Sequence, residues 1–414
     1  MDRYNGTGKR DAKGKPMFFH EVNEGPPDAI FGLLGAFAAD ARPGKVNLLV
    51  GIYKDEHLKS ELLSSVRKAK EQILGEDLLA DFLPIDGMPD LVELLGALVF
   101  GESRWAEAHA RIYGAQTVGG TSALRVGAEF LAQEVTKSVS IPNQTWPNHR
   151  SIFERAGMRV ETYPYYSREK KGFDFQAMMN CLESLPAKTV VVLHASCHNP
   201  SGCDPTMEEW REISKAMRQR NLLPFFDFAY QGLGDVPEND AASVRLFMDD
   251  GHEMAIAYSC SKNFSMYCQR VGSLFIVNEN AAVKLRVGSQ VKRIIRANYS
   301  NPPAHGGKIV SHILKTGELK RQWLKDLEGV RHRLNLIRES LVQRLVAKAK
   351  KSDFRYLRSH KGMFSFVDLE KNQVQEMIAK YGIYLLDNGR INVAGLTAKN
   401  IDAVVHALIA VCEP

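Results

Sequence analysis

A lysine lies among small hydroxyl residues in the stretch Ser259-Cys-Ser-Lys-Asn-Phe264, and Arg270 follows that lysine by eight residues. A lysine amine acts as a nucleophile near neutral pH where desolvation or neighbouring cations lower its pKa. The hydroxyls of Ser259 and Ser261 and the guanidinium of Arg270 suit a phosphate group close to that amine. The pattern therefore predicts a reactive amine, Lys262, beside a bound phosphate.

Two other polar segments begin where strand-like runs stop, as the Ser259 segment does. His194-Ala-Ser-Cys-His-Asn-Pro-Ser-Gly202 follows one run, and Asp227-Phe-Ala-Tyr230 follows the next. Ligands of open α/β sheets bind at strand ends, so we expect these segments to form one site. Gly119-Gly120-Thr121 precedes a helical pattern and also suits an anion, although a plain N-cap by Thr121 is the simpler interpretation.

Short β-branched and aromatic runs alternate with amphipathic stretches through the middle of the chain. This alternation predicts an α/β fold with a doubly wound, mostly parallel sheet. The expected strands are 138–141, 159–163, 189–194, 223–227, 255–259 and 271–277, and the expected helices include 61–75, 121–135, 146–156 and 206–219.

The pattern changes after Gly306 and predicts a second, smaller α+β domain. Residues 308–350 have helical spacing, which we expect Gly317 and Gly329 to interrupt. Short strands are expected at 355–357, 364–368, 384–386 and 390–393, followed by a helix that opens at Thr397. The predicted organisation is a tail (1–15), an N-terminal arm with part of the small domain (16–47), a large cofactor-binding domain (48–315) and a small C-terminal domain (316–414).

Composition narrows the function classes. The chain has 414 residues, of which 44% are hydrophobic and 25% charged, which excludes disorder or a coiled coil for most of its length. Its apolar runs are far shorter than the ~20 residues of a membrane span. The net charge of +6 is too small to indicate nucleic-acid binding, since five basic and two acidic residues lie in the first fifteen.

The cysteines and the N-terminal residues bear on the compartment. Six cysteines in a chain of this length do not form a disulfide framework, which favours a reducing compartment. The N-terminal stretch has no apolar segment for secretion, and it carries acids that a transit peptide avoids. We therefore expect a flexible tail or an expression remnant, and a cytoplasmic protein rather than a mitochondrial one.

Eight stretches in their order and spacing carry a family resemblance. From about Phe18 onward the chain resembles the class I aspartate/aromatic aminotransferases, which are fold-type I pyridoxal-phosphate enzymes. The matching stretches are Arg42–Asn47, Gln116–Arg125, Trp146–His149, His198–Gly202, Asp227–Gly232, Ser261–Phe264, Arg296–His305 and Gly389–Gly395.

The resemblance implies a role in cofactor chemistry for each matched residue. Lys262 should bond to the cofactor and carry the proton between the substrate α-carbon and the cofactor. Asp227 should face the pyridine nitrogen and keep it protonated. The remaining implied contacts are Tyr230 and Asn199 at the phenolic oxygen, Trp146 stacked on the ring, Gly120, Thr121, Ser259 and Arg270 at the phosphate, and His149 and His194 behind Asp227.

The resemblance also implies how substrate is held. Arg390 should grip the α-carboxylate in a two-pronged contact that lysine could not reproduce, with Gly51, Trp146 and Asn199 beside it. Arg296 resembles the arginine for the distal carboxylate of aspartate or glutamate, which reaches in from the neighbouring subunit of a homodimer. No metal is implied.

One residue departs from the family pattern. The family usually has a tyrosine where this chain has Phe82, and that tyrosine donates its hydroxyl to the cofactor phosphate of the other subunit. Phe82 can fill the space but cannot donate, so the phosphate should be held less tightly, by roughly 1–2 kcal/mol.

Three alternatives compete with this interpretation. A metal hydrolase built on His194, Cys197 and His198 lacks a fourth ligand at suitable spacing. A ligand-sensing domain of a transcription regulator, which would keep the cofactor but not the catalysis, would need an appended DNA-binding domain, which fifteen polar residues cannot form. An aromatic amino acid or kynurenine aminotransferase stays open. We therefore expect a dimeric aminotransferase that exchanges an amino group between aspartate and 2-oxoglutarate by a ping-pong route. Aromatic amino acids are further candidate substrates.

Overall fold

The computed structural model describes residues 19, 22–25, 29–75 and 81–413. The expected tail (1–15) lies outside these residues. In the described part, no helix is both long and apolar enough to cross a membrane.

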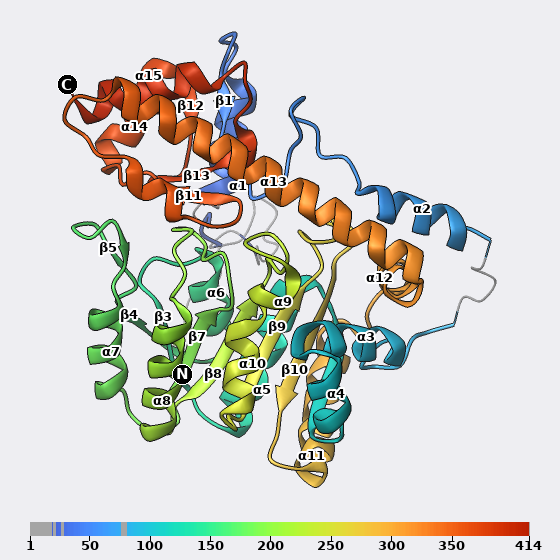
Figure 1. Ribbon diagram of the computed structural model, residues 1–414. Coiled ribbons are helices and arrows are strands. Elements are labelled where there is room, and N and C mark those ends of the chain that lie inside the picture. The colour runs from blue at the N-terminus through green and yellow to red at the C-terminus, as the bar shows by residue number, and fades with distance from the viewer. Residues whose placement is uncertain (1–18, 20–21, 26–28, 76–80, 414) are drawn as a thin grey trace, which may run out of the picture.

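A seven-stranded sheet forms the centre of the larger part of the molecule (Figure 1). Its strand order is β2-β10-β9-β8-β7-β3-β4. The strands β9, β8, β7, β3 and β4 are mutually parallel, whereas β10 runs antiparallel to both of its neighbours. The bounds are β2 (Ile112–Val118), β3 (Ser138–Pro142), β4 (Arg159–Tyr163), β7 (Val190–His194), β8 (Leu223–Phe228), β9 (Met254–Ser259) and β10 (Val271–Val277).

The α/β fold and all six expected strands of this sheet are confirmed, but the seventh strand, β2, was not predicted. Its sequence, Ile-Tyr-Gly-Ala-Gln-Thr-Val, places Gly114, Ala115 and Gln116 at its centre. Glycine and alanine are depleted in strands, so the pattern is weak. Pairing with β10 along the whole strand supplies the stability that local propensity lacks.

Helices cover both faces of the sheet because successive strand residues point to opposite sides. In β7, Val190 and Val192 pack in one hydrophobic cluster, and Val191 and Leu193 pack in another. The first cluster includes α5 (Gly119–Glu134), α6 (Asn148–Arg155) and α11 (Ala281–Asn298). The second includes α3 (Pro89–Phe100), α4 (Glu102–Ala108), α7 (Phe175–Ser184), α8 (Met207–Gln219) and α10 (Ala242–Asp249).

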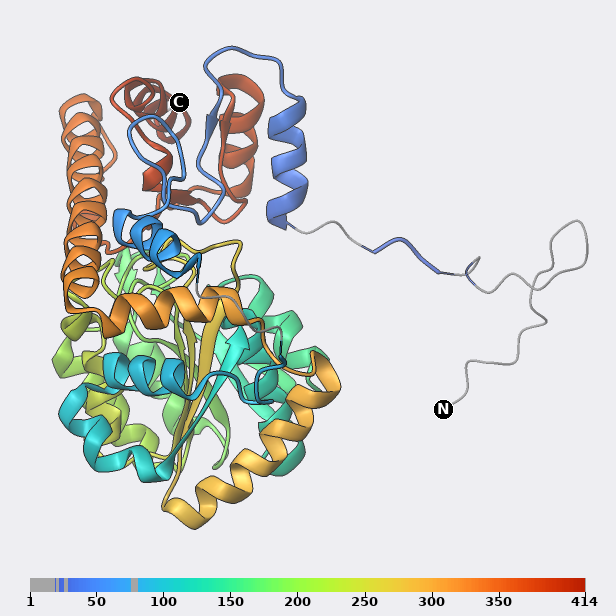
Figure 2. The same ribbon diagram turned by 90° about the vertical axis from the view of Figure 1, so that its right-hand side faces the viewer.

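The smaller part of the molecule lies above one end of the sheet, toward the carboxyl ends of the parallel strands (Figures 1 and 2). It combines both ends of the described chain, since β1 (Val46–Asn47) pairs in parallel with β12 (Ile383–Tyr384). Its other elements are α1 (Ala29–Ala39), η2 (Arg355–Ser359), β11 (Phe364–Phe366), α14 (Lys371–Tyr381), β13 (Arg390–Asn392), η3 (Val393–Gly395) and α15 (Ile401–Cys412).

A long helix joins the two parts. α13 (Gly317–Lys348) begins next to α12 (Ala304–Lys315) and ends in the smaller part (Figure 1). Gly317 marks a helix boundary as expected, but the expected interruption at Gly329 is wrong, because α13 is continuous there. A glycine inside a helix costs only about 1 kcal/mol, which the buried face of a 32-residue helix outweighs.

Two other expectations in the smaller part are wrong. Residues 355–357 form the 3₁₀-helix η2 rather than a strand, because Asp353 accepts a hydrogen bond from the backbone N–H of Arg355 and turns the chain. The terminal helix begins at Ile401 rather than Thr397, whose carbonyl instead accepts from the Ile401 N–H in a preceding turn.

The remaining elements are short or connect the two parts. They are α2 (Ser64–Ile73), η1 (His109–Arg111), the pair β5 (Tyr166–Ser167) and β6 (Gly172–Phe173), and α9 (Pro237–Asp240). α2 packs against both α12 and α13.

Candidate active site

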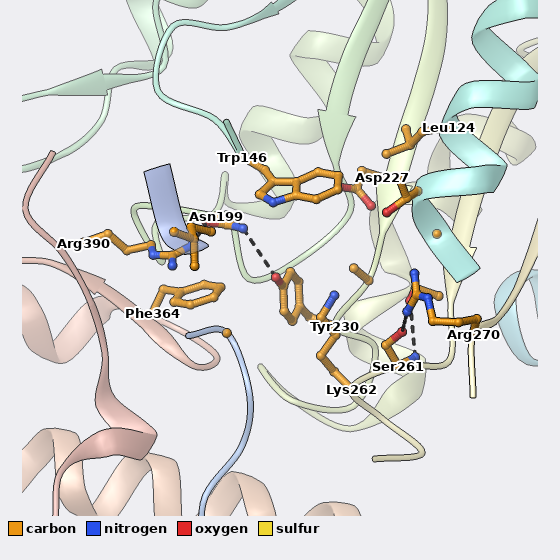
Figure 3. Close-up of a pocket in the computed structure, with 16 residues that line it drawn as sticks. Leu124, Trp146, Asn199, Asp227, Tyr230, Ser261, Lys262, Arg270, Phe364 and Arg390 are labelled. Carbon is orange, nitrogen blue, oxygen red and sulfur yellow. Dashed lines mark hydrogen bonds between the residues drawn. The ribbon is translucent and has the colours of Figure 1, made fainter. Parts of the chain in front are cut away.

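A pocket of about 180 Å³ lies where the parallel strands end and the smaller part begins. Twelve of the predicted site residues line it: Gly51, Gly120, Thr121, Trp146, Asn199, Asp227, Tyr230, Ser259, Ser261, Lys262, Arg270 and Arg390. Figure 3 shows the Lys262 amine near the middle, with Arg270 and Arg390 at opposite ends. Sequence segments far apart along the chain therefore form one site.

Lys262 follows β9 in the loop that the Ser259 segment forms. Its Nζ lies 5.1 Å from the centre of the Tyr230 ring. Burial, together with the charges of Arg270 and Arg390, lowers the pKa of Lys262 to about 8, against the opposing effect of Asp227. About a tenth of this amine is therefore unprotonated at pH 7, far more than for an ordinary lysine, and the free amine is the form that acts as a nucleophile or proton acceptor.

Asp227, the next-to-last residue of β8, anchors a buried polar chain. Its Oδ2 lies 3.1 Å from Nε2 of His149, and Nδ1 of His149 lies 2.7 Å from the Thr145 hydroxyl, which also lies 3.0 Å from Nε2 of His194. Burial opposes ionisation, but the His149 hydrogen bond and nearby positive charge hold the pKa of Asp227 below its usual value. The pocket thus presents a carboxylate, not a carboxylic acid.

The opposite wall is built from the start of α5 and from Arg270. A Cβ on Gly120 would lie 2.9 Å from the Ser259 Cβ, and one on Gly119 would lie 2.5 Å from Nη2 of Arg270. Glycine is therefore required for this close approach of the helix start to β9 and Arg270. The free N–H groups of the helix start and the guanidinium suit an anion.

Hydrogen bonds hold this wall in place. Nη1 of Arg270 donates to the Ser261 hydroxyl and to the Tyr267 carbonyl, both at 3.1 Å. Thr121 is not the N-cap of α5, because Val118 occupies that position and makes no side-chain cap. The plain N-cap interpretation of Thr121 is therefore wrong, and this residue lines the pocket instead.

Arg390 forms the third part of the site, at the first position of β13. It is 1% exposed, and its guanidinium carbon lies 4.3 Å from the centre of the Phe364 ring. Nη1 donates to Oδ1 of Asn199 at 3.0 Å and Nη2 donates to the Leu49 carbonyl, whereas Nε has no hydrogen-bond partner among the described residues. Burial lowers its pKa to about 10, so it remains a cation at neutral pH.

Asn199 also joins this end of the pocket to its centre, since its Nδ2 lies 3.5 Å from the Tyr230 hydroxyl. The structure adds Ile30, Leu124, Ala229 and Phe364 to the predicted lining. Phe364 carries no sequence signal, because only the pairing of β11 with β13 brings its ring to Arg390. The apolar Ile30 and Leu124 carry none either.

Two residues predicted to contact cofactor or substrate, Phe82 and Arg296, lie outside the pocket, and His149 and His194 lie behind its wall as expected. Phe82 is 92% exposed, and Arg296 is exposed near the end of α11, where it donates to the Ser300 hydroxyl. Both were expected to act in a neighbouring subunit, so their roles stay predictions.

Proteins of known function resemble this chain along most of its length. A profile of the family "Aminotransferase class I and II" matches residues 43–408. The chain belongs to this family. It is 41% identical over 394 residues to the aspartate aminotransferase of Escherichia coli, covering 95% of this chain and all of that protein. It is 40% identical to aspartate aminotransferase 1 of Medicago sativa, covering 99% of each.

Solved structures of aminotransferases match the whole fold as well. An aromatic-amino-acid aminotransferase from Burkholderia pseudomallei, covalently bound to pyridoxal phosphate, superposes with a TM-score of 0.92 at 41% identity, covering 95% of this chain and 99% of that one. The cytoplasmic aspartate aminotransferase of Saccharomyces cerevisiae superposes with a TM-score of 0.92 at 33% identity, covering 95% and 98%.

Pyridoxal phosphate is the cofactor of this aminotransferase family, and the pocket suits it. Three cations, Lys262, Arg270 and Arg390, face one carboxylate, Asp227. This excess of positive charge matches a cofactor phosphate and a substrate carboxylate together. The close approach at Gly119 and Gly120 brings the helix start and Arg270 to one wall, where a phosphate would need them.

Proposed function

We propose that this aminotransferase exchanges an amino group between aspartate and 2-oxoglutarate by a ping-pong route, with pyridoxal 5'-phosphate as cofactor. The buried Arg390 carries the proposal, because its Nε has no partner among the described residues while it lines the pocket. A planar guanidinium at the end of a pocket suits the carboxylate common to every amino acid and 2-oxo acid.

We assign the cofactor-holding roles to the residues around Lys262. The start of α5, Ser259 and Arg270 would hold the phosphate, and Trp146 would cover the ring face. Asp227, kept ionised by His149, would favour a protonated pyridine nitrogen. The bound cofactor supplies the electron sink that a carbon acid next to an amine requires.

Lys262 is assigned the proton transfer at the substrate α-carbon. An amine with a pKa of about 8 accepts and returns a proton near neutral pH, as efficient acid–base catalysis requires. Tyr230 lies beside the amine, and burial raises the pKa of this phenol, so it acts as a neutral hydrogen-bond donor.

The distal carboxylate of the substrate requires a second cation. We assign that role to Arg296 of a second subunit, which makes the active unit a homodimer with sites at the interface, and we propose the cytoplasm as its compartment. The exposure of Arg296 and Phe82 in the single chain supports this assembly.

A second candidate is an aminotransferase for aromatic amino acids or kynurenine. Its support is the likeness to solved aromatic amino acid aminotransferases, including one from Psychrobacter sp. B6 cocrystallised with aspartic acid. An aromatic side chain would occupy the same position as the distal carboxylate.

Steady-state rates decide between the candidates. The purified protein should be measured with aspartate, tyrosine, phenylalanine, kynurenine and alanine against 2-oxoglutarate. We expect the highest kcat/KM for aspartate. A higher value for an aromatic substrate or kynurenine would favour the second candidate, and no transamination with any of them would contradict the proposal.

A further inference from the structure

A second pocket lies behind the active site, on the other side of the 194–202 loop. Asn199 of this loop lines the active site, while Cys197 contacts the chain near Gly234 and Gly362. The second pocket has a volume of about 370 Å³ and is formed by α13, the segment 358–361 and Gly234. We call it the basic pocket. It shares no lining residue with the active site.

Arg338 of α13 is a buried cation without a counter-ion. It is 3% exposed, and its guanidinium donates only to neutral acceptors, the Gly362 carbonyl, the Ser365 hydroxyl and the side chain of Asn335. In the part of the chain that the structure describes, no carboxylate forms an ion pair with it. A buried charge left without an opposite charge is unfavourable, so this residue would gain from a nearby anion.

His360 lies in the same pocket with unused hydrogen-bonding capacity. It is also 3% exposed, and neither of its ring nitrogens has a hydrogen-bond partner among the described residues. Burial and the charge of Arg338 lower the pKa of His360 to about 3, so the ring is neutral and carries one N–H donor. Buried polar atoms without partners are rare, and they indicate a missing ligand or water.

Two exposed cations complete the lining. Arg358 pairs with Glu339, whose Oε2 lies 3.0 Å from its Nε, while Lys361 adds a second charge at the rim. The carboxylates of Asp204 and Asp235 also attract Lys361. Both already accept hydrogen bonds from backbone N–H groups of nearby loop residues. The lining itself therefore carries three cations and one carboxylate.

We propose that the basic pocket binds a small oxyanion, either inorganic phosphate or the phosphate group of a small ester. Side chains that carry N–H donors, from α13 and from the segment 358–361, line the cavity, which suits the several acceptor oxygens of a phosphate. The cavity is larger than one free ion, so an ester would fill it further. The inference is independent of the proposed amino-acid substrates.

Binding to the holoenzyme tests this proposal. Inorganic phosphate should be titrated by calorimetry, and thermal unfolding followed in parallel, at constant ionic strength. We expect saturable binding and a rise in Tm with phosphate concentration. His360→Leu and Lys361→Met should each weaken the affinity about tenfold, since each removes a donor to a charged ligand. These two variants decide the test, because Arg338→Met would also remove the hydrogen bonds to the Gly362 carbonyl and the Ser365 hydroxyl.

Two controls separate this pocket from other phosphate sites. Arg344→Met removes another arginine of α13, one that pairs with Asp402 outside the pocket, and should leave the affinity unchanged. Arg390→Leu should also leave it unchanged. Equal affinity in His360→Leu and the parent protein, or loss of binding in Arg390→Leu alone, would overturn the proposal.

A second ligand distinguishes the two sources of the phosphate group. Glycerol 3-phosphate that binds more tightly than inorganic phosphate would assign the pocket to an ester, and equal or weaker binding would assign it to the free ion. Absence of saturable binding by both compounds would overturn the proposal.

Discussion

At the scale of single residues, the environment of Lys262 links burial to chemistry. Desolvation disfavours the charged form of the amine and lowers its pKa. The nearby carboxylate of Asp227 raises the pKa, whereas the charges of Arg270 and Arg390 lower it. The balance leaves a pKa of about 8, which is useful for an amine that must lose and regain a proton. Neighbours in three dimensions, rather than the lysine itself, set this value.

Removing the amine tests its role directly. Lys262→Ala should retain the fold and bind pyridoxal phosphate non-covalently, without the absorbance of the lysine-bound cofactor. Transamination should fall by at least about 10²–10⁴-fold, the usual contribution of one acid–base group. Lys215→Ala, an exposed lysine of α8, is the control. Near-normal rates in Lys262→Ala would contradict the assignment.

The pKa of Lys262 predicts a pH dependence in the cofactor-free protein. Only the unprotonated amine attacks the cofactor aldehyde, so the rate of attachment should rise about tenfold per pH unit and level off near pH 8. Arg390→Leu removes a charge that lowers this pKa, and the break should therefore move to higher pH. Borohydride trapping followed by mass spectrometry measures the rate. A break that stays in place would show that Arg390 does not act on the amine.

Arg296 should discriminate between substrates. Arg296→Leu leaves the distal carboxylate of aspartate unpaired in a buried site, at a cost of about 3–5 kcal/mol, while phenylalanine loses little. We expect kcat/KM for aspartate to fall by about 10²–10⁴-fold. Arg293→Leu, one turn earlier on α11, is the matched control. Equal losses for both substrates would make Arg296 structural.

At the scale of secondary-structure elements, α13 supplies the N-terminal cap that α2 lacks. The N-cap residue of α2, Leu63, makes no side-chain cap. Asp326 of α13 replaces it, since its Oδ2 accepts from the Ser65 N–H at 2.8 Å and its Oδ1 accepts from the Ser64 hydroxyl at 2.7 Å. A carboxylate at a helix start also interacts favourably with the helix dipole.

Loss of this cap should destabilise the protein without changing the site. Asp326→Ala should lower the free energy of unfolding by about 1–2 kcal/mol, as other lost caps do. Urea unfolding followed by circular dichroism measures the change. Glu328→Ala, at an exposed position of the same helix, should stay within about 0.5 kcal/mol. An equal effect in both variants would show that the cap contributes nothing.

At the scale of the whole molecule, Phe82 links cofactor binding to assembly. Its side chain is exposed in the single chain, and the family resemblance predicts that it reaches the cofactor phosphate of a second subunit. Phe82→Tyr adds one oxygen in a space already shaped for a ring. A hydrogen bond to a charged phosphate is worth about 1.5–3 kcal/mol, so cofactor dissociation should slow by about tenfold or more.

The effect depends on the dimer and has its own control. Phe82→Leu also lacks the hydroxyl and should not slow dissociation, which is followed by cofactor absorbance after rapid dilution. Unchanged cofactor affinity in Phe82→Tyr would mean that the ring points elsewhere or that another donor already occupies the position.

Local patterns determined much of this protein. The strands β7, β8 and β9 and the polar segments after them follow from short apolar runs that end abruptly, and such runs depend on nearby residues alone. The Lys262 segment was recognisable for the same reason. The errors at β2, Gly329 and Arg355 arise where tertiary pairing, helix packing or a side-chain hydrogen bond outweighs local propensity.

Only the tertiary structure decided which distant groups meet. Arg390 lies far along the chain from Asn199 and Leu49, and nothing in its local sequence requires that their oxygens accept its hydrogen bonds. The same is true of the basic pocket, where Arg338 and His360 are ordinary residues until burial removes water and leaves their polar atoms unpaired. Desolvation and the pairing of polar groups depend on packing in three dimensions, so short sequence patterns cannot predict them.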